Sequence, residues 1–240
     1  MKEPLIDAVF ELRFSSTTAA SVVLPGYLYE KLSGEKTIEQ LPIAQLPKPI
    51  READPNLRFA PLSRISWGQF FINVGDFSIS VSCKYPYPGW VAFRSAIIDT
   101  INILVGSGFV ESVDRYSMKY VDMIPSSDDK KKVSMINFSV SIAGHTLEKE
   151  PFHLRIEIPR DGLVNAVQVI SSAQAVLHTG ATMDGMIVDV DTFAAQGGIS
   201  IHSLIDGFQD KLNSIHATNK AMFFDCLTQQ TILSLEPVYE

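Results

Sequence analysis

The sequence predicts an α+β protein with a curved, mainly antiparallel β-sheet of about eight or nine strands packed on two or three helices. Three observations support this prediction. Many segments alternate between apolar and polar residues, two segments carry apolar residues at helical spacing, and Gly75-Asp76 and Asp161-Gly162 mark tight turns between alternating segments. Alternation that leaves one polar face is typical of antiparallel sheets, so a doubly wound parallel sheet is not expected.

The N-terminal quarter contains one strand, one short helix and one proline-rich connection. Residues 5–14 form a strand, because apolar side chains occupy every second position and charged ones lie between them. A short helix is expected over 24–32, with Pro25 near its first turn. Five prolines between residues 41 and 61 exclude a continuous helix there, so an extended surface connection is expected.

A β-hairpin and a helix follow. Residues 65–74 and 77–83 form the two strands of the hairpin, and Gly75-Asp76 provides its tight turn. From Trp90 to Leu104, apolar residues recur at spacings of three and four, which predicts a helix with one apolar stripe.

The second half of the chain is rich in strands and ends in a helix. Strands are expected over residues 115–124, 133–142, 152–158, 163–170, 174–178 and 186–193. Asp161-Gly162 predicts a tight turn, and Ser126–Lys132 a charged one. The final helix is expected from about Leu204 to Leu227, with Ser203 as its cap. The order of elements is compatible with two related half-units, within a single domain over residues 1–240.

Composition narrows the class of protein. The chain has 240 residues, of which 46% are hydrophobic and 20% charged, so a folded core is expected. Its 27 acidic and 20 basic residues give a net charge of −7, which argues against nucleic acid as the main partner. No signal peptide and no transmembrane segment is recognised, and Cys83 and Cys226 form no C-x-x-C pair. A cytoplasmic protein with reduced thiols and no membrane partner is expected.

The common catalytic motifs are missing. The sequence contains no Walker P-loop, no G-x-G-x-x-G and no Gly-x-Ser-x-Gly elbow, and no cofactor is expected. Asp189 and Asp191 are the one candidate metal pair, because two carboxylates on one face of a strand can bind Mg²⁺. The alternative for this pair is the solvated face of an edge strand.

Two groups of residues are candidates for binding. Arg115, Tyr116 and Tyr120, with Trp90, would line a polar pocket if they converge inside a curved sheet. Tyr85, Tyr87 and Trp90 cluster around two prolines, and such aromatic side chains favour partner surfaces. The alternative for this second group is a strand-to-helix corner in which Trp90 fills the core. Oppositely charged residues can also pair across strands, namely Glu11 with Arg13, Arg115 with Asp122, and Arg155 with Glu157.

Several segments resemble a sporadically distributed, uncharacterised bacterial protein family of about this length. The opening residues 4–14 resemble its "PL-x-EAVFELRF" start, and Tyr87-Pro88-Gly89-Trp90 and residues 185–191, which carry the late D-x-D motif, follow in the same order. Lys119 stands where the family commonly has Arg. The patchy distribution of the family implies a place in mobile defence or toxin–antitoxin systems, which is an association and not a property of the residues.

Three functions follow from these observations. The leading hypothesis is a non-enzymatic module that binds a protein partner or itself, as an accessory or antitoxin-like component of a bacterial conflict system. The second is a small-ligand binder in which the sheet grips a helix around the pocket of Arg115, Tyr116 and Tyr120. The third is a Mg²⁺-dependent phosphoryl-transfer enzyme that uses Asp189 and Asp191.

Overall fold

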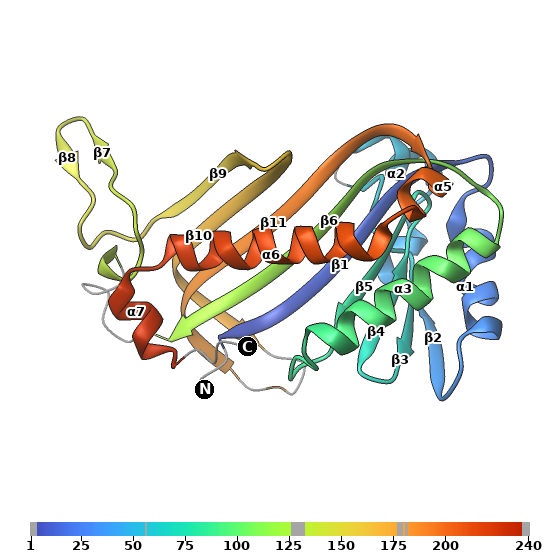
Figure 1. Ribbon diagram of the computed structural model, residues 1–240, viewed down its shortest axis with the longest axis horizontal. Helices are drawn as coiled ribbons and strands as arrows, with labels where there is room; N and C mark the ends of the chain where they lie inside the picture. The colour runs from blue at the N-terminus through green and yellow to red at the C-terminus, as the bar shows by residue number, and fades with distance from the viewer. Residues whose placement is uncertain (1–3, 56, 126–132, 177–179, 181, 237–240) are drawn as a thin grey trace. The chain divides into compact units, whose positions relative to one another are not determined.

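A computed structural model describes residues 4–55, 57–125, 133–176, 180 and 182–236. The fold is α+β, as predicted, with one open antiparallel sheet of nine strands in the order β2-β3-β4-β5-β1-β6-β11-β10-β9 (Figure 1). The nine strands are β1 (Leu5–Ser16), β2 (Lys36–Gln40), β3 (Ser63–Trp67), β4 (Phe70–Val74), β5 (Ser78–Cys83), β6 (Val110–Pro125), β9 (His153–Arg160), β10 (Leu163–Val176) and β11 (Thr182–Ser200).

The described residues form six α-helices, three of them seven residues or longer. The helices are α1 (Ala20–Lys31), α2 (Lys48–Ala53), α3 (Trp90–Gly106), α5 (Ile201–Ile205), α6 (Phe208–Cys226) and α7 (Gln229–Ser234). No described helix has both the length and the apolar character that crossing a membrane requires.

The chain divides into two compact units. Unit 1 comprises Met1–Ala8, Lys119–Thr192 and Ile215–Glu240, and unit 2 comprises Val9–Met118 and Phe193–Ser214. The chain passes from one unit to the other within β1, β6, β11 and α6, so these four elements contribute residues to both. The single domain expected over residues 1–240 stays a prediction.

In unit 2, helices α1 and α3 cover one face of the strands. Both helices contact these strands and each other, and the predicted apolar stripe of α3 is confirmed. Its buried side chains include Phe93, Ile97, Ile101 and Leu104. They pack in a core with the alternate residues of β1, namely Phe10, Leu12 and Phe14. Apolar residues recur at every second position in the strands and at every third or fourth position in the helices. Each element therefore has one apolar face, and these faces pack against each other in the core.

Three expectations for unit 2 are corrected. The segment 65–74 is two strands, because the backbone turns at Gly68, whose φ of +51° glycine adopts readily. Helix α1 begins at Ala20, so Pro25 lies inside it. The proline-rich segment is not extended throughout, because it contains α2 and a 3₁₀ helix over Pro42–Gln45. Both short helices carry proline in their first turn, where its missing N–H costs no hydrogen bond.

The turn between β4 and β5 explains where α1 begins. Asp76 is 4% exposed, and its carboxylate accepts a 2.8 Å bond from Nη2 of Arg51 on α2. The same carboxylate accepts a hydrogen bond from the hydroxyl of Ser21, and the Asp76 carbonyl accepts one from the N–H of Ala20 at 2.9 Å. These bonds satisfy groups at the start of α1, which would otherwise lack partners.

In unit 1, α6 packs on β10 and β11. The buried cluster there contains Val167, Val169, Val188 and Val190 from the strands and Met222, Phe223 and Leu227 from the C-terminal segment. The tight turn predicted between β9 and β10 is confirmed, with φ of +53° at Asp161 and +77° at Gly162. Two consecutive positive φ values are typical of the hairpin turn whose twist matches the flanking strands.

One expectation for unit 1 is wrong. Residues 133–142 form a 3₁₀ helix over Val133–Met135 and the two-residue strand β7 (Ser141–Ile142), which pairs with β8 (His145–Thr146). Ile136 forms an isolated β-bridge with Leu227, and the N–H of Asn137 donates to the Cys226 carbonyl at 2.7 Å. These two contacts hold the segment against the end of α6, so it does not join the sheet as a long strand. The charged turn expected over Ser126–Lys132 lies outside the described residues, as does part of the strand expected over 174–178.

The final helix is also divided. Ser200 caps α5 by accepting a 3.1 Å hydrogen bond from the N–H of Ser203, so Ser200 and not Ser203 is the cap. Gly207, with φ of +66°, then separates α5 from α6. Helix α6 then runs without a break over Phe208–Cys226.

We expect Gly185→Ala to destabilise the fold by about 1–3 kcal/mol, because overpacking costs this much where backbone cannot yield. A Cβ at Gly185 on β11 would overlap the carbonyl oxygen of Ile124 on β6. Urea denaturation measures the loss. Gly26→Ala in α1 is the control, because no atom lies within 4 Å of the added methyl, and its unfolding free energy should not fall. An equal loss of unfolding free energy in Gly185→Ala and Gly26→Ala would contradict the close approach of Gly185 to the Ile124 carbonyl.

Candidate functional site

Buried polar side chains join α6 to the sheet in unit 1. Nδ2 of Asn219 donates to the Val190 carbonyl at 2.8 Å and to Oγ1 of Thr192 at 3.0 Å. The Thr192 hydroxyl in turn donates to Oδ1 of Asn165 at 2.7 Å. All three side chains are at most 1% exposed, so each hydrogen bond avoids the cost of an unsatisfied buried group. This chain of contacts fixes the position of α6 along β11.

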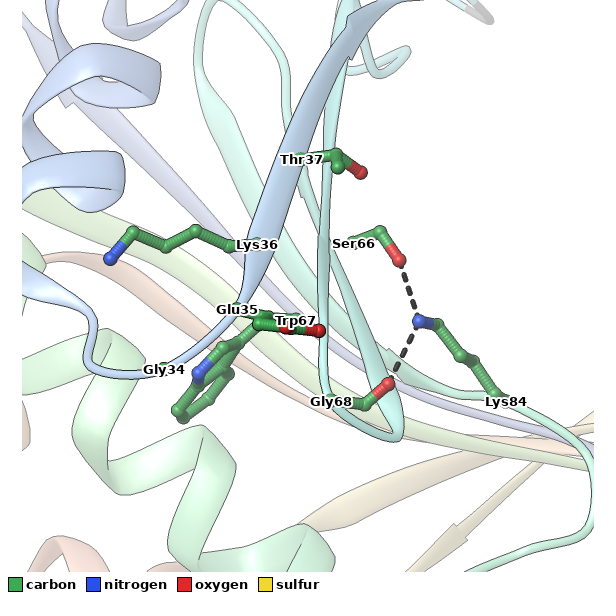
Figure 2. Close-up of a pocket in the computed structure, with 8 residues that line it drawn as sticks. All are labelled: Gly34, Glu35, Lys36, Thr37, Ser66, Trp67, Gly68 and Lys84. Atoms are coloured by element: carbon green, nitrogen blue, oxygen red, sulfur yellow. Dashed lines mark hydrogen bonds between the residues drawn. The ribbon is translucent and has the colours of Figure 1, made fainter.

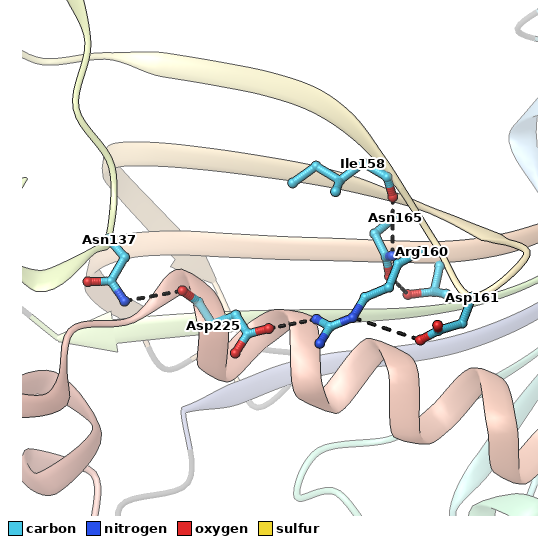
Figure 3. A network of polar contacts seen from close by, with 7 residues as sticks. Asn137, Ile158, Arg160, Asp161, Asn165 and Asp225 are labelled. Atoms are coloured by element: carbon cyan, nitrogen blue, oxygen red, sulfur yellow. Dashed lines mark hydrogen bonds and ion pairs between the residues drawn. The ribbon is translucent and has the colours of Figure 1, made fainter.

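A more exposed network connects the β9–β10 hairpin to the C-terminal end of α6 (Figure 3). Nη1 of Arg160 lies 2.6 Å from the carboxylate of Asp225, and its Nε lies 3.9 Å from Asp161. Asn137 donates to the carbonyl of Asp225 at 3.2 Å. The side chains of Arg160 and Asp225 are 40% and 60% exposed, so this ion pair contributes little stability.

Tyr120 and His216 form a second contact between the sheet and α6. The Tyr120 hydroxyl lies 3.0 Å from Nδ1 of His216, and their rings meet edge to face. Burial, with a smaller contribution from the charge of Lys220, lowers the pKa of His216 to about 4. The imidazole is therefore neutral near pH 7. The sequence does not reveal this contact, because 96 positions separate the two residues.

The residues expected to line a ligand pocket lie on different faces of β6. Arg115 holds its guanidinium 4.0 Å from the centre of the Phe193 ring. Tyr116 and Tyr120 belong to the buried face and are 6% and 7% exposed. Burial also raises the pKa of Tyr116. Because neighbouring strand residues project to opposite faces, β6 does not bring Arg115 together with the two tyrosines.

The candidate metal pair lies on the polar face of β11, where Asp189 and Asp191 alternate with the buried Val188, Val190 and Thr192. Asp189 is ion-paired with Lys119 of β6 at 2.9 Å. Burial raises the pKa of Asp189, although the ammonium of Lys119 acts in the opposite direction. Among the residues that the structure describes, no group of three His, Cys, Asp or Glu is arranged to hold a metal ion. Asp191 shares the face of Asp189.

Asp7 of β1 belongs to the same charged region. Burial raises the pKa of this carboxyl as well, and the charges of Lys119 and Asp189 act on it with opposite signs. Arg155 of β9 also acts on Asp189, in the direction that lowers its pKa. In unit 1 the polar face of the sheet therefore carries acidic and basic side chains near one another on several strands.

The aromatic corner packs mostly against α3. The rings of Tyr87 and Trp90 meet the buried Phe93 edge to face, with centroids 6.1 and 6.3 Å from it. Tyr85 is 36% exposed. This arrangement fits the strand-to-helix corner that the sequence offers as the alternative, and the proposed partner-binding role of the three residues stays a prediction.

A pocket of about 350 Å³ lies beside β2 and the β3–β4 turn in unit 2 (Figure 2). The ammonium of Lys84 donates to Oγ of Ser66 at 2.6 Å and to the Gly68 carbonyl at 2.8 Å. Nε1 of Trp67 donates to the Ser33 carbonyl at 2.8 Å. The sequence did not indicate this pocket, and its main polar groups bond to the protein itself.

The outer strand β9 ends the sheet and is largely exposed. Six of its eight residues are exposed, including Ile156 at 43%. Arg155 and Glu157 form an ion pair at 2.8 Å, with side chains 55% and 49% exposed. The sequence suggested pairing across strands, whereas both this pair and Glu11–Arg13 (2.6 Å) join residues two apart on one strand. Within the described parts of the chain, β9 pairs with β10 alone.

No protein-family model matches the chain, and the comparison with curated proteins finds no match. The family resemblance described above therefore stays a prediction.

We expect Asp189→Asn to be more stable than the wild type near pH 7 and equal to it in acid. A carboxyl whose pKa is raised by folding binds its proton more tightly in the native state, so its stabilisation is lost as the pH rises above the ordinary value of 3.8. Unfolding free energies from about pH 3 to pH 7 measure the difference.

Lys119→Met is the companion variant for this measurement. Removing the ammonium that lowers the pKa of Asp189 should widen the pH range over which stability falls. A difference between wild type and Asp189→Asn that does not depend on pH would contradict the raised pKa.

The contribution of His216 to stability changes with pH in the opposite direction to that of Asp189. Folding lowers the pKa of its imidazole from 6.5 to about 4, so stability is complete above pH 6.5 and is lost as the pH falls toward 4. The loss across that range should be on the order of 3 kcal/mol, and His216→Gln should remove it. Tyr120→Phe is the control that keeps the loss, because burial and not the phenol is the cause. An NMR titration of His216 with a midpoint near 6.5 would refute this.

Proposed function

We propose that the protein is a non-enzymatic binding module that binds a protein partner, or a second copy of itself, through the exposed edge of β9. One observation carries the proposal: β9 ends the nine-stranded order, and six of its eight residues are exposed. An unpaired strand edge presents N–H and C=O groups that readily pair with another chain.

The side chains of β9 support a binding role. Its alternating residues give one charged face, with Arg155 and Glu157, and one apolar face, with Leu154, Ile156 and Ile158. Ile158 packs against the buried cluster of unit 1, while Ile156 is 43% exposed. Another strand laid along this edge would cover Ile156 and remove apolar surface from water.

The two alternative functions have less support. The ligand-binding hypothesis needs Arg115, Tyr116 and Tyr120 in one pocket, and their positions on β6 separate the guanidinium from the two rings. The phosphoryl-transfer hypothesis needs Asp189 for a metal ion, and Lys119 already forms an ion pair with this carboxylate. A role in a bacterial defence or toxin system is part of the proposal only through the family resemblance, and the genes beside this one would test it.

We expect Ile156→Lys to weaken association roughly tenfold or more, because a lysine on an open strand edge opposes pairing. Analytical ultracentrifugation of the whole chain measures the dissociation constant. Val22→Lys on α1 is the matched control, because Val22 is 75% exposed and lies far from β9 in the sequence. A wild-type chain that is monomeric, and that does not co-purify with the product of an adjacent gene, would contradict the proposed function.

A further inference from the structure

Among the residues that the structure describes, β9 pairs with β10 alone, so its backbone presents hydrogen-bonding groups at alternate residues along its other edge. The N–H of Ser171 donates to the Phe152 carbonyl at 3.0 Å, and β9 and β10 pair in register from Ile170↔His153 to Leu163↔Arg160. In an antiparallel ladder the residues that face the partner strand alternate with those that face away. The even-numbered residues of β9 therefore bond to β10, and His153, Arg155, Glu157 and Pro159 direct their backbone groups to the open edge.

We infer that β9 pairs with β9 of a second copy of this chain, antiparallel and about a two-fold axis at Ile156. The inference rests on the proposed function and names its partner, strand and register. In this register Arg155 of each copy lies opposite Glu157 of the other. Directly opposed residues of this kind exchange both backbone hydrogen bonds, and their opposite charges lie on the same face.

The neighbouring registers are disfavoured by charge. An axis at Arg155 places the two Arg155 side chains opposite each other, and an axis at Glu157 does the same for the two glutamates. An axis at Leu154 sets Arg155 opposite His153, so none of these registers brings Arg155 to a glutamate. Directly opposed like charges destabilise strand pairing, and the axis at Ile156 is the one that sets each Arg155 opposite a Glu157.

The apolar face and the end of the strand agree with the same register. Ile156 meets its own copy at the axis, and Leu154 lies opposite Ile158. These pairs fall at non-hydrogen-bonded positions, where side chains approach closest. The backbone of Pro159 faces the open edge, so its missing N–H removes no hydrogen bond between β9 and β10. In the dimer, the Pro159 carbonyl can still accept a hydrogen bond from the N–H of His153 in the other copy.

Charge reversal tests the register. We expect the wild-type chain to be a dimer, and Arg155→Glu or Glu157→Arg alone to weaken it roughly tenfold or more, because each creates two like-charged pairs. An equimolar mixture of the two variants should form a heterodimer, seen by native mass spectrometry, because every opposed pair is then of opposite sign. The double variant Arg155→Glu/Glu157→Arg should dimerise alone. Glu30→Arg on α1, where the glutamate is 67% exposed, is the control for added charge.

A cross-link gives a second measurement that does not depend on the charges. In a chain whose Cys83 and Cys226 are replaced by alanine, Ile156→Cys should form an intermolecular disulfide on mild oxidation, because opposed Cβ atoms at such a position are about 4.5–5.5 Å apart. Val22→Cys should not form one. Circular dichroism confirms that each variant is folded.

The outcomes separate the inference from the proposed function. If Ile156→Lys dissociates the protein but the charge reversals do not, the register is wrong and the binding role of the β9 edge stands. If the variants dissociate but their mixture forms no heterodimer, the two-fold pairing is likewise overturned. If the wild type is monomeric, the inference fails; the proposed function then stands only if Ile156→Lys releases another bound protein.

Discussion

Side-chain alternation along the antiparallel strands is the constraint on which the other features of this protein depend. Each strand places every second side chain on a face that a helix must cover, and the residues between them on a face that can remain polar. In unit 2, α1 and α3 cover the apolar face. In unit 1, α6 covers the valines of β11, and the charges of Asp189 and Lys119 lie on the other face. A shift of one residue in any strand would exchange these faces.

Hydrophobic packing alone leaves several positions of a helix on a sheet nearly equal in energy. Two buried polar contacts remove this freedom, one in each unit. In unit 1, Asn219 reaches the carbonyl of Val190 and the hydroxyl of Thr192, so α6 has one favourable position along β11. In unit 2, Asp76 connects the β4–β5 turn with Arg51 and with the start of α1. If either partner were lost, the remaining buried polar group would lack a hydrogen bond. This destabilises the folded state, because in the unfolded chain the same group bonds to water.

The local features of this fold could be predicted from the sequence, because they depend on neighbouring residues. The apolar stripe of α3 follows from spacing, and the Asp161-Gly162 turn follows from the backbone preference of its residues. The start of α1 could not be predicted, because the bonds that fix it come from Asp76. The strand expected over 133–142 failed for a similar reason, since Ile136 and Asn137 are tied to the end of α6.

The candidate sites depended still more on distant contacts. The sequence identified Asp189 and Tyr120 as residues of interest, but not the partners that each would find, Lys119 and His216. It grouped Arg115 with Tyr116, although residues adjacent on a strand point to opposite faces. It did identify Arg155 and Glu157 as an oppositely charged pair. Their separation by one residue on an outer strand becomes meaningful only when β9 is known to end the sheet.

In the proposed dimer, the charge order of β9 also limits how far the assembly can grow through this edge. Arg155 and Glu157 lie symmetrically about Ile156, so the strand complements its own reversed copy. A contact of this kind uses the same surface on both molecules, and the pairing of two copies consumes it completely. Strand edges that join head to tail leave a fresh edge after every addition and extend into fibres. In the proposed dimer the β9 edge recognises only its own reverse, so pairing through this edge stops at two copies.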